Sequence, residues 1–322
     1  MPPSKFGKTV PRGVYAPLNT FYKPNQAQDL DLDAFKKHVA FVAGAGVGVV
    51  ALGSMGEAVQ LTHSERNLVL RAARDALDAD PALANIPLIA GTGASSTRET
   101  IELSKEAAEA GADFTMVIAP GYFAGALSKK ALKTFFVEVA EASPIPVILY
   151  NYPGASAGID MDSDLITEIA AASSNIVGIK LTCGSVGKLT RLTTLREDFA
   201  VLGGFIDFLG PSLLANAAGG ITGTANVFPK SCLKLYTDTT AALSGSSGPA
   251  ALSAATKSQS IVSGADWALQ KVGISGTKWV LEQLEGRGGE PRRPILPFDA
   301  GEGRGERLLA ELKDIIKLEK SL

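Results

Sequence analysis

Short apolar segments alternate with longer amphipathic segments up to about residue 230. The short segments are rich in β-branched residues and have the length of buried strands. Between the first six of them, apolar residues recur every three to four positions opposite polar ones, which is the pattern of a helix with one buried face. The predicted strands are residues 14–18, 47–52, 87–90, 114–118, 146–150, 176–181, 200–202 and 220–224, and the predicted helices are residues 32–43, 65–77, 97–110, 129–142 and 163–172.

Polar residues mark where these helices begin, and glycines mark where two of them end. Thr62 and Glu65 have the spacing of a capping box, in which two side chains satisfy free N–H groups at the helix start. Gly44 and Gly111 follow predicted helix ends, where a glycine adopts the left-handed conformation at no steric cost. The predicted N-caps are Ser64, Ser96, Ser128 and Asp162.

Eight strands joined by helices predict an α/β fold, the closed parallel (β/α)8 or TIM barrel. An open doubly wound sheet is the alternative, but its dinucleotide fingerprint lies after a first strand and before a helix. The comparable run here, Gly44, Gly46 and Gly48, lies after a predicted helix and before a predicted strand. We therefore interpret it as a helix–strand turn.

The strand–helix alternation stops after about residue 230. From there to residue 284 the sequence is helical, with a Ser/Gly-rich stretch at 244–248, and an amphipathic pattern near 305–321 predicts a last helix. We predict a barrel domain over residues 1–230, with its active site at the C-terminal ends of the strands, and a helical extension over residues 231–322 packed on it.

The composition excludes several classes of protein. Hydrophobic residues make up 46% of the chain and the formal net charge is −2, which excludes an intrinsically disordered chain. The 31 basic residues are balanced by 33 acidic ones without a basic block, so nothing favours nucleic-acid binding. No apolar run reaches the ~18–20 residues of a membrane span. We expect neither nucleic acids nor membranes as partners.

The N-terminus and the cysteines bear on the compartment. The N-terminus carries Lys5, Lys8 and Arg12 without an acid, lacks an apolar segment, and is too rich in Pro and Gly for a transit helix. Cys183 and Cys232 are too few for a disulfide framework, so we expect reduced thiols. The sequence therefore predicts a cytoplasmic protein.

The two histidines, His38 and His63, limit the chemistry. Neither belongs to an HxH or HExxH pattern, so a zinc site built from imidazoles is not expected. A GxSxG nucleophile elbow is absent from the sequence. We therefore predict chemistry carried by Lys, Tyr, Ser or carboxylate side chains, without a metal or a cofactor.

Lys180 stands near the end of the apolar strand 176–181, where barrel enzymes place reactive groups. A lysine is rarely buried without a partner, and burial without a nearby acid lowers its pKa. A neutral amine is the nucleophile that attacks a carbonyl group. The alternative is that Lys180 extends out of the barrel mouth or pairs with a structural acid.

Two more candidate residues lie at the same end of the predicted barrel. Tyr150 is the last residue of one strand, and Ser54 follows another. Tyr150 ends the neighbouring fifth strand, so its phenol can relay protons beside the amine; otherwise it caps the barrel. Ser54 lies in a glycine-rich turn, and the N–H groups of Ser54 and Met55 can bind a carboxylate; the alternative is a simple tight turn. We interpret Glu57 as a structural acid that binds backbone N–H groups.

Three motifs together resemble a known family. They are Gly-Ser-Met-Gly-Glu at 53–57, Leu-Tyr-Asn-x-Pro-Gly at 149–154 and Gly-Ile-Lys at 178–180. In this order and spacing they are similar to the dihydrodipicolinate synthase / N-acetylneuraminate lyase family of pyruvate-dependent class I aldolases, and the resemblance extends from Gly13 to residues 291–294. Within the family, the sequences of these motifs are most similar to those of fungal enzymes that cleave 2-keto-3-deoxy sugar acids.

The resemblance implies a role for each matching residue. Lys180 matches the lysine that forms the Schiff base, and Tyr150 matches the tyrosine that relays protons. Ser54 matches the hydroxyl residue that links this tyrosine to a second one, which Tyr122 matches and which in many members reaches the neighbouring subunit's site. Gly204 matches a glycine whose backbone lies along the substrate. The family also implies a homotetramer, built as a dimer of dimers, acting on a small 2-keto acid.

Departures from the family pattern bear on the substrate. Dihydrodipicolinate synthases carry an arginine where this chain has Ala155, so a fixed partner for an anionic aldehyde is missing. Met55 replaces a threonine, and Thr182 replaces the acid of some members and is expected to bind a substrate hydroxyl. We predict cleavage of a 2-keto-3-deoxy sugar acid to pyruvate and a hydroxy-aldehyde such as glyceraldehyde. The alternatives are a 4-hydroxy-2-oxoglutarate aldolase, which releases glyoxylate, and a catalytically silent barrel that binds keto acids.

Overall fold

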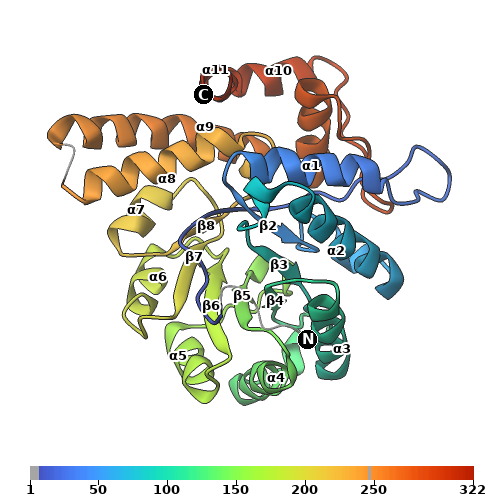
Figure 1. Ribbon diagram of the computed structural model, residues 1–322, viewed down its shortest axis with the longest axis vertical. Helices are drawn as coiled ribbons and strands as arrows, with labels where there is room; N and C mark the ends of the chain where they lie inside the picture. The colour runs from blue at the N-terminus through green and yellow to red at the C-terminus, as the bar shows by residue number, and fades with distance from the viewer. Residues whose placement is uncertain (1–6, 246–247) are drawn as a thin grey trace.

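The computed structural model describes residues 7–245 and 248–322 of the chain. Eight parallel strands close into a barrel in which each strand pairs with its neighbours in sequence and β1 pairs with β8, as Figure 1 shows. This confirms the predicted (β/α)8 barrel and excludes the open doubly wound sheet. The strands are β1 (Gly13–Pro17), β2 (Gly48–Ala51), β3 (Leu88–Gly91), β4 (Phe114–Ile118), β5 (Val147–Asn151), β6 (Ile176–Leu181), β7 (Ala200–Gly203) and β8 (Gly219–Ile221).

A ring of helices surrounds the strands, and the last helices pack beside α1 and α8 at one side of the ring (Figure 1). The ring consists of α1 (Leu32–Gly44), α2 (His63–Asp78), α3 (Thr97–Glu109), α4 (Lys129–Ala142), α5 (Ser163–Ala172), α6 (Val186–Leu192), α7 (Leu209–Leu214) and α8 (Pro229–Leu243). Short 3-10 helices are η1 (Ala58–Gln60), η2 (Pro81–Leu83), η3 (Ala124–Ala126), η4 (Pro153–Ala155) and η5 (Gly223–Asn226). The helices after α8 are α9 (Gly248–Glu285), α10 (Arg304–Glu311) and α11 (Lys313–Lys320).

The predicted helix starts are confirmed at three of four positions, where Ser96, Ser128 and Asp162 cap α3, α4 and α5. Ser64 is the exception, because α2 begins one residue before it. Its N-cap is Thr62, whose hydroxyl accepts from the Glu65 N–H while the Glu65 carboxylate accepts from the Thr62 N–H at 2.9 Å. The predicted capping box is thus present and sets the start of the helix.

Glycines end both α1 and α3. The glycine after α3 is at the predicted position, and the one after α1 is not. Gly111 follows α3 with a φ of 91°, as predicted. Gly44 is still helical, and the left-handed position after α1 is Gly46, with a φ of 82°. A side chain on Gly48 would lie 2.3 Å from the Tyr15 ring, so this glycine lets β2 approach β1 closely. The segment from Gly44 to Gly48 is thus a helix–strand turn, as predicted.

Alternation along β5 and β6 points the reactive side chains into the barrel. Leu149, Ile179 and Leu181 pack outward against the helices, in a cluster with residues of α4 and α5. Tyr150 packs inside the barrel. Tyr150 and Lys180 are directly paired in the parallel register of the two strands. Since side chains of paired residues lie on the same face of a sheet, both point inward.

The C-terminal extension differs from its prediction in two places. Non-helical backbone at Gly273, with a φ of 58°, kinks α9. The single predicted last helix is two helices, α10 and α11, joined at the fully buried Leu312. The Ser/Gly-rich stretch at 244–248 lies partly outside the described residues, as do the first six residues used to predict the compartment. The division of the chain at residue 230 stays a prediction.

Buried polar contacts attach α9 and the segment after it to the barrel. Lys278 on α9 is fully buried and donates hydrogen bonds to the Thr20 carbonyl at 2.8 Å, the Glu57 carboxylate at 3.1 Å and the Glu290 carbonyl at 2.7 Å. The Glu57 carboxylate also accepts from the Arg292 N–H at 2.6 Å. Glu57 therefore joins the turn after β2 to the extension, which agrees with its interpretation as a structural acid.

None of the described helices is both long enough and apolar enough to cross a bilayer.

Candidate active site

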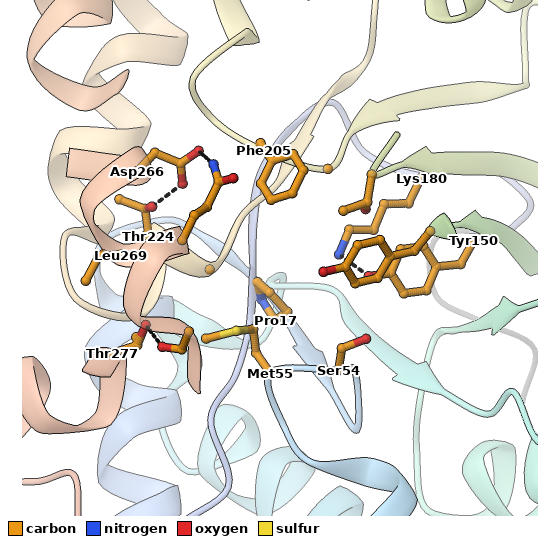
Figure 2. A pocket seen from close by; sticks show the side chains of 16 residues that line it. Pro17, Ser54, Met55, Tyr150, Lys180, Phe205, Thr224, Asp266, Leu269 and Thr277 are labelled. Carbon is orange, nitrogen blue, oxygen red and sulfur yellow. Dashed lines mark hydrogen bonds between the residues drawn. The ribbon is translucent and has the colours of Figure 1, made fainter. Parts of the chain in front are cut away.

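A cavity of about 200 Å³ opens at the C-terminal ends of the strands. Six residues singled out in the sequence line it, together with residues of α9 and of the loops after β7 and β8. Figure 2 shows Lys180 and Tyr150 at one end and Asp266 at the other. The six residues from the sequence are Ser54, Met55, Tyr150, Lys180, Thr182 and Gly204.

Lys180 is 4% exposed, and its Nζ donates to the Tyr150 hydroxyl at 3.4 Å. The same Nζ lies 4.4 Å from the centre of the Tyr150 ring. Burial lowers the pKa of Lys180 to about 7, and no charged neighbour among the described residues contributes to this shift. The amine therefore neither extends into solvent nor pairs with an acid, and a large fraction of it is neutral near pH 7.

Tyr150 is 4% exposed and keeps its proton at neutral pH. Burial raises the pKa of its phenol, and the nearby hydroxyls of Ser54 and Thr182 oppose the rise. The ring of Tyr152 stacks on it at 5.8 Å between ring centres. A protonated phenol beside an amine can donate a proton and take one back through a neighbouring hydroxyl.

The turn that carries Ser54 and Met55 is held from the first strand. The Asn19 amide donates to the Met55 carbonyl at 3.0 Å, and the Thr20 hydroxyl donates to the Gly56 carbonyl at 2.7 Å. Among the described residues, no hydrogen bond uses the N–H of Ser54 or Met55. These two N–H groups are free to bind a carboxylate.

Thr182 and Gly204 are in close contact on the third side of the cavity. A side chain on Gly204 would lie 2.1 Å from the Thr182 Oγ1, so only glycine fits. The Thr182 hydroxyl is buried and has no hydrogen-bond partner of normal geometry among the described residues. A buried hydroxyl left unpaired by the protein is a place where a ligand can bind.

Two residues from the sequence lie outside this cavity. Tyr122 follows β4, is 81% exposed and packs edge-on against Phe123 at 4.9 Å between ring centres. Ala155 lies in η4 and lines a neighbouring cavity of about 240 Å³, which shares Ser54 and Tyr150 with the first cavity. Within one chain, neither Tyr122 nor Ala155 faces Lys180.

The far wall of the cavity was missed by the sequence analysis. It comes mainly from α9, which the sequence predicted only as part of a helical extension. No motif marked these residues, because the return of α9 across the barrel mouth depends on contacts far apart in sequence. The missed lining residues include Asp266, Leu269, Gln270, Gly273 and Thr277, with Phe205 and Thr224 from the loops.

The described residues contain no group of three or more His, Cys, Asp or Glu side chains placed to hold a metal ion.

Comparison with known proteins identifies the family. Residues 11–313 match the Dihydrodipicolinate synthetase family. The chain belongs to this family. A protein of Emericella nidulans named "Probable 4-hydroxy-2-oxoglutarate aldolase, mitochondrial" is 43% identical over 96% of both chains. A protein of Aspergillus niger named "L-threo-3-deoxy-hexylosonate aldolase" is 40% identical over 96% of both chains.

Solved structures of this Dihydrodipicolinate synthetase family have the same fold. YagE from E. coli K12, solved in complex with pyruvate, has a TM-score of 0.82 and 30% identity, covering 94% of this chain and 98% of its own. A dihydrodipicolinate synthase family protein from Coccidioides immitis has a TM-score of 0.84 and 33% identity, covering 98% and 99%. The predictions of this family and of an aldolase are confirmed.

Proposed function

We propose that this member of the Dihydrodipicolinate synthetase family is a class I aldolase that cleaves a 2-keto-3-deoxy sugar acid to pyruvate and a hydroxy-aldehyde such as glyceraldehyde. The observation that carries the proposal is the buried Lys180 amine, whose pKa is lowered by burial alone, 3.4 Å from the Tyr150 phenol. An uncharged amine beside a proton donor is what attack on a ketone requires.

The first half of the reaction forms the Schiff base. The neutral Lys180 amine attacks the C2 ketone, and the resulting carbinolamine loses water after Tyr150 protonates its hydroxyl. The C1 carboxylate binds to the N–H groups of Ser54 and Met55 and to the Ser54 hydroxyl. This contact keeps C2 beside the Lys180 Nζ.

The second half breaks the carbon–carbon bond. Tyr150, having given up its proton, takes the proton from the C4 hydroxyl, and the C3–C4 bond breaks to release an aldehyde. The bond's electron pair moves into the protonated imine and forms an enamine. Protonation of the enamine at C3 and hydrolysis of the imine release pyruvate and restore the Lys180 amine. Thr182, whose buried hydroxyl has no partner of normal hydrogen-bond geometry among the described residues, supplies a hydrogen bond to a substrate hydroxyl.

We also propose that the working unit contains more than one chain, as a homotetramer built from dimers. The exposed rings of Tyr122 and Phe123 support this, since they are 81% and 67% exposed in the segment after β4. Gly121 packs against Ser156 in the loop after β5, which places these rings near the neighbouring cavity. A second copy covering this face would bring Tyr122 into reach of a site, as the family resemblance implies.

The second candidate is cleavage of 4-hydroxy-2-oxoglutarate, which the name of the Emericella nidulans relative favours. Its aldehyde product, glyoxylate, carries a carboxylate. The cavity holds no lysine or arginine besides Lys180 among its described lining residues, so a second carboxylate would lack a cation. We therefore rank the sugar acid first.

A substrate screen tests these alternatives. Purified enzyme is incubated with 2-keto-3-deoxy sugar acids of different chain length and stereochemistry and with 4-hydroxy-2-oxoglutarate, and pyruvate release is measured. Fastest release from a sugar acid supports the proposal, and fastest release from 4-hydroxy-2-oxoglutarate supports the second candidate. Binding without turnover of any substrate would favour a silent keto-acid-binding barrel.

The cytoplasm as the compartment of this protein also stays a proposal, since the Emericella nidulans relative is named mitochondrial.

A further inference from the structure

Helix α9 closes the end of the cavity opposite Lys180 with a buried carboxylate. Asp266 is 2% exposed and lines the cavity (Figure 2). Its Oδ1 accepts from the hydroxyl of Thr224 and, at 3.4 Å, from the hydroxyl of Thr222. Its Oδ2 accepts from the Gln270 amide at 2.9 Å and from the Asp207 N–H at 3.4 Å. These four donors fix the carboxylate in place.

The contact with Asp266 also fixes the orientation of the Gln270 side chain. A carboxylate only accepts hydrogen bonds, so the amide nitrogen of Gln270 must face Asp266. The carbonyl Oε1 of Gln270 is then turned away from Asp266, and the side chain lines the cavity. A carbonyl oxygen binds a hydroxyl group, which can donate, and repels a carboxylate, which cannot.

The end of the cavity formed by Asp266 carries negative charge. Burial raises the pKa of Asp266 to about 6, so its carboxylate is still mostly ionised near pH 7.5. The described lining residues include no cation other than Lys180, which stands at the opposite end and is needed as a neutral amine. A substrate tail that ends in a carboxylate would meet an acid with no compensating cation.

We propose that Gln270, positioned by Asp266, determines the substrate class by binding a hydroxyl on the uncharged tail of the sugar acid and excluding tails that end in a carboxylate. Gln270 contacts the substrate, and Asp266 is a positioning residue that also supplies the repelling charge. The inference deepens the proposed function and rests on it for the reaction at Lys180.

Two variants separate these roles. Gln270→Leu removes the hydrogen bond at similar size and is expected to lower kcat/KM for a six-carbon 2-keto-3-deoxy sugar acid by about 10–100-fold, the usual cost of a lost substrate hydrogen bond. The same variant should not lower kcat/KM for 4-hydroxy-2-oxoglutarate, because its carboxylate tail has no hydrogen bond to the Gln270 carbonyl to lose. Asp266→Asn removes the charge and should raise the ratio of kcat/KM for 4-hydroxy-2-oxoglutarate to that for the sugar acid about tenfold.

The matched control is Gln259→Leu on the same helix. The Gln259 amide donates to the carbonyls of Ile206 and Asp207, each at 3.0 Å, and does not line the cavity. This variant loses hydrogen bonds that attach α9 to the loop after β7, whereas Gln270→Leu loses a contact within α9, so the control measures loosening of α9 without loss of a cavity contact. We expect it to leave the ratio of the two substrates unchanged, even if it lowers thermal stability.

Trapping of pyruvate by borohydride separates the failure of this inference from that of the proposed function. Pyruvate has no tail, so its adduct tests the chemistry at Lys180 alone, and both wild type and the Gln259→Leu control should form the reduced Lys180 adduct. If wild type forms no adduct, the proposed function is wrong. If the adduct forms but Gln270→Leu lowers kcat/KM equally for both substrates, or Gln259→Leu shifts their ratio as much, the inference about Gln270 is overturned while the aldolase mechanism stands.

Discussion

Lys180 and Tyr150 are paired across β5 and β6, and the Lys180 Nζ lies 3.4 Å from the phenol oxygen. Both side chains are 4% exposed, so little of the pair is in contact with bulk solvent. The parallel register fixes this distance without loops, which are the more mobile parts of a protein. A site built on neighbouring strands keeps its amine and its proton donor aligned through both halves of the reaction.

The first prediction concerns the covalent intermediate. Incubation with pyruvate and borohydride should add one reduced adduct per chain, on Lys180, because burial lowers the pKa of its amine to about 7. Peptide mass spectrometry locates the adduct. Lys278 is the matched control, since it is equally buried but bonded to Glu57. An adduct on Lys278 or on a surface lysine would contradict the assignment.

The second prediction is the pH dependence of adduct formation. With a pKa of about 7, Lys180 is protonated and unreactive below that pH and neutral above it. The rate of borohydride trapping at saturating pyruvate should therefore rise about tenfold per pH unit below 7 and level off above it. A rate that still rises about tenfold per pH unit between pH 8 and pH 10 would mean that the Lys180 amine keeps the usual pKa of a lysine.

The third prediction separates proton transfer from adduct formation. Tyr150→Phe should lower turnover of the best substrate by about 10²–10⁴-fold, the usual contribution of a general acid–base group. Pyruvate trapping on Lys180 should slow but persist, because the amine remains buried. Tyr152→Phe is the matched control on the stacked ring and should retain most activity. Near-normal cleavage by Tyr150→Phe would show that another group moves the proton.

The fourth prediction concerns stability. Glu57→Ala leaves the buried Lys278 ammonium without its acid partner and should destabilise the fold by about 3–5 kcal/mol. Urea unfolding measures this loss. Arg98→Ala breaks an exposed ion pair with Glu102 and should cost no more than about 0.5 kcal/mol. Equal effects of the two substitutions would mean that the buried pair contributes no more than a surface pair.

The sequence predicted what depends on local pattern. Strand and helix periodicity predicted the barrel, and strand ends predicted that Lys180, Tyr150 and Ser54 line one cavity. It did not predict that Ala155 lies in the neighbouring cavity, because a single 3-10 turn is too short to show a periodicity that fixes the direction of its side chains. Nor did it predict the Asp266–Gln270 wall, whose position depends on how α9 returns to the barrel.

The attachment of the turn after β2 to the extension has a consequence for the order of synthesis. When β8 has been made, the chain already contains Lys180, Tyr150 and Ser54, but not Lys278 or the Arg292 N–H that holds Glu57. The turn beside Ser54 gains these partners only when translation has reached residue 292. A nascent or prematurely terminated chain would therefore carry every reactive side chain and still lack a formed site.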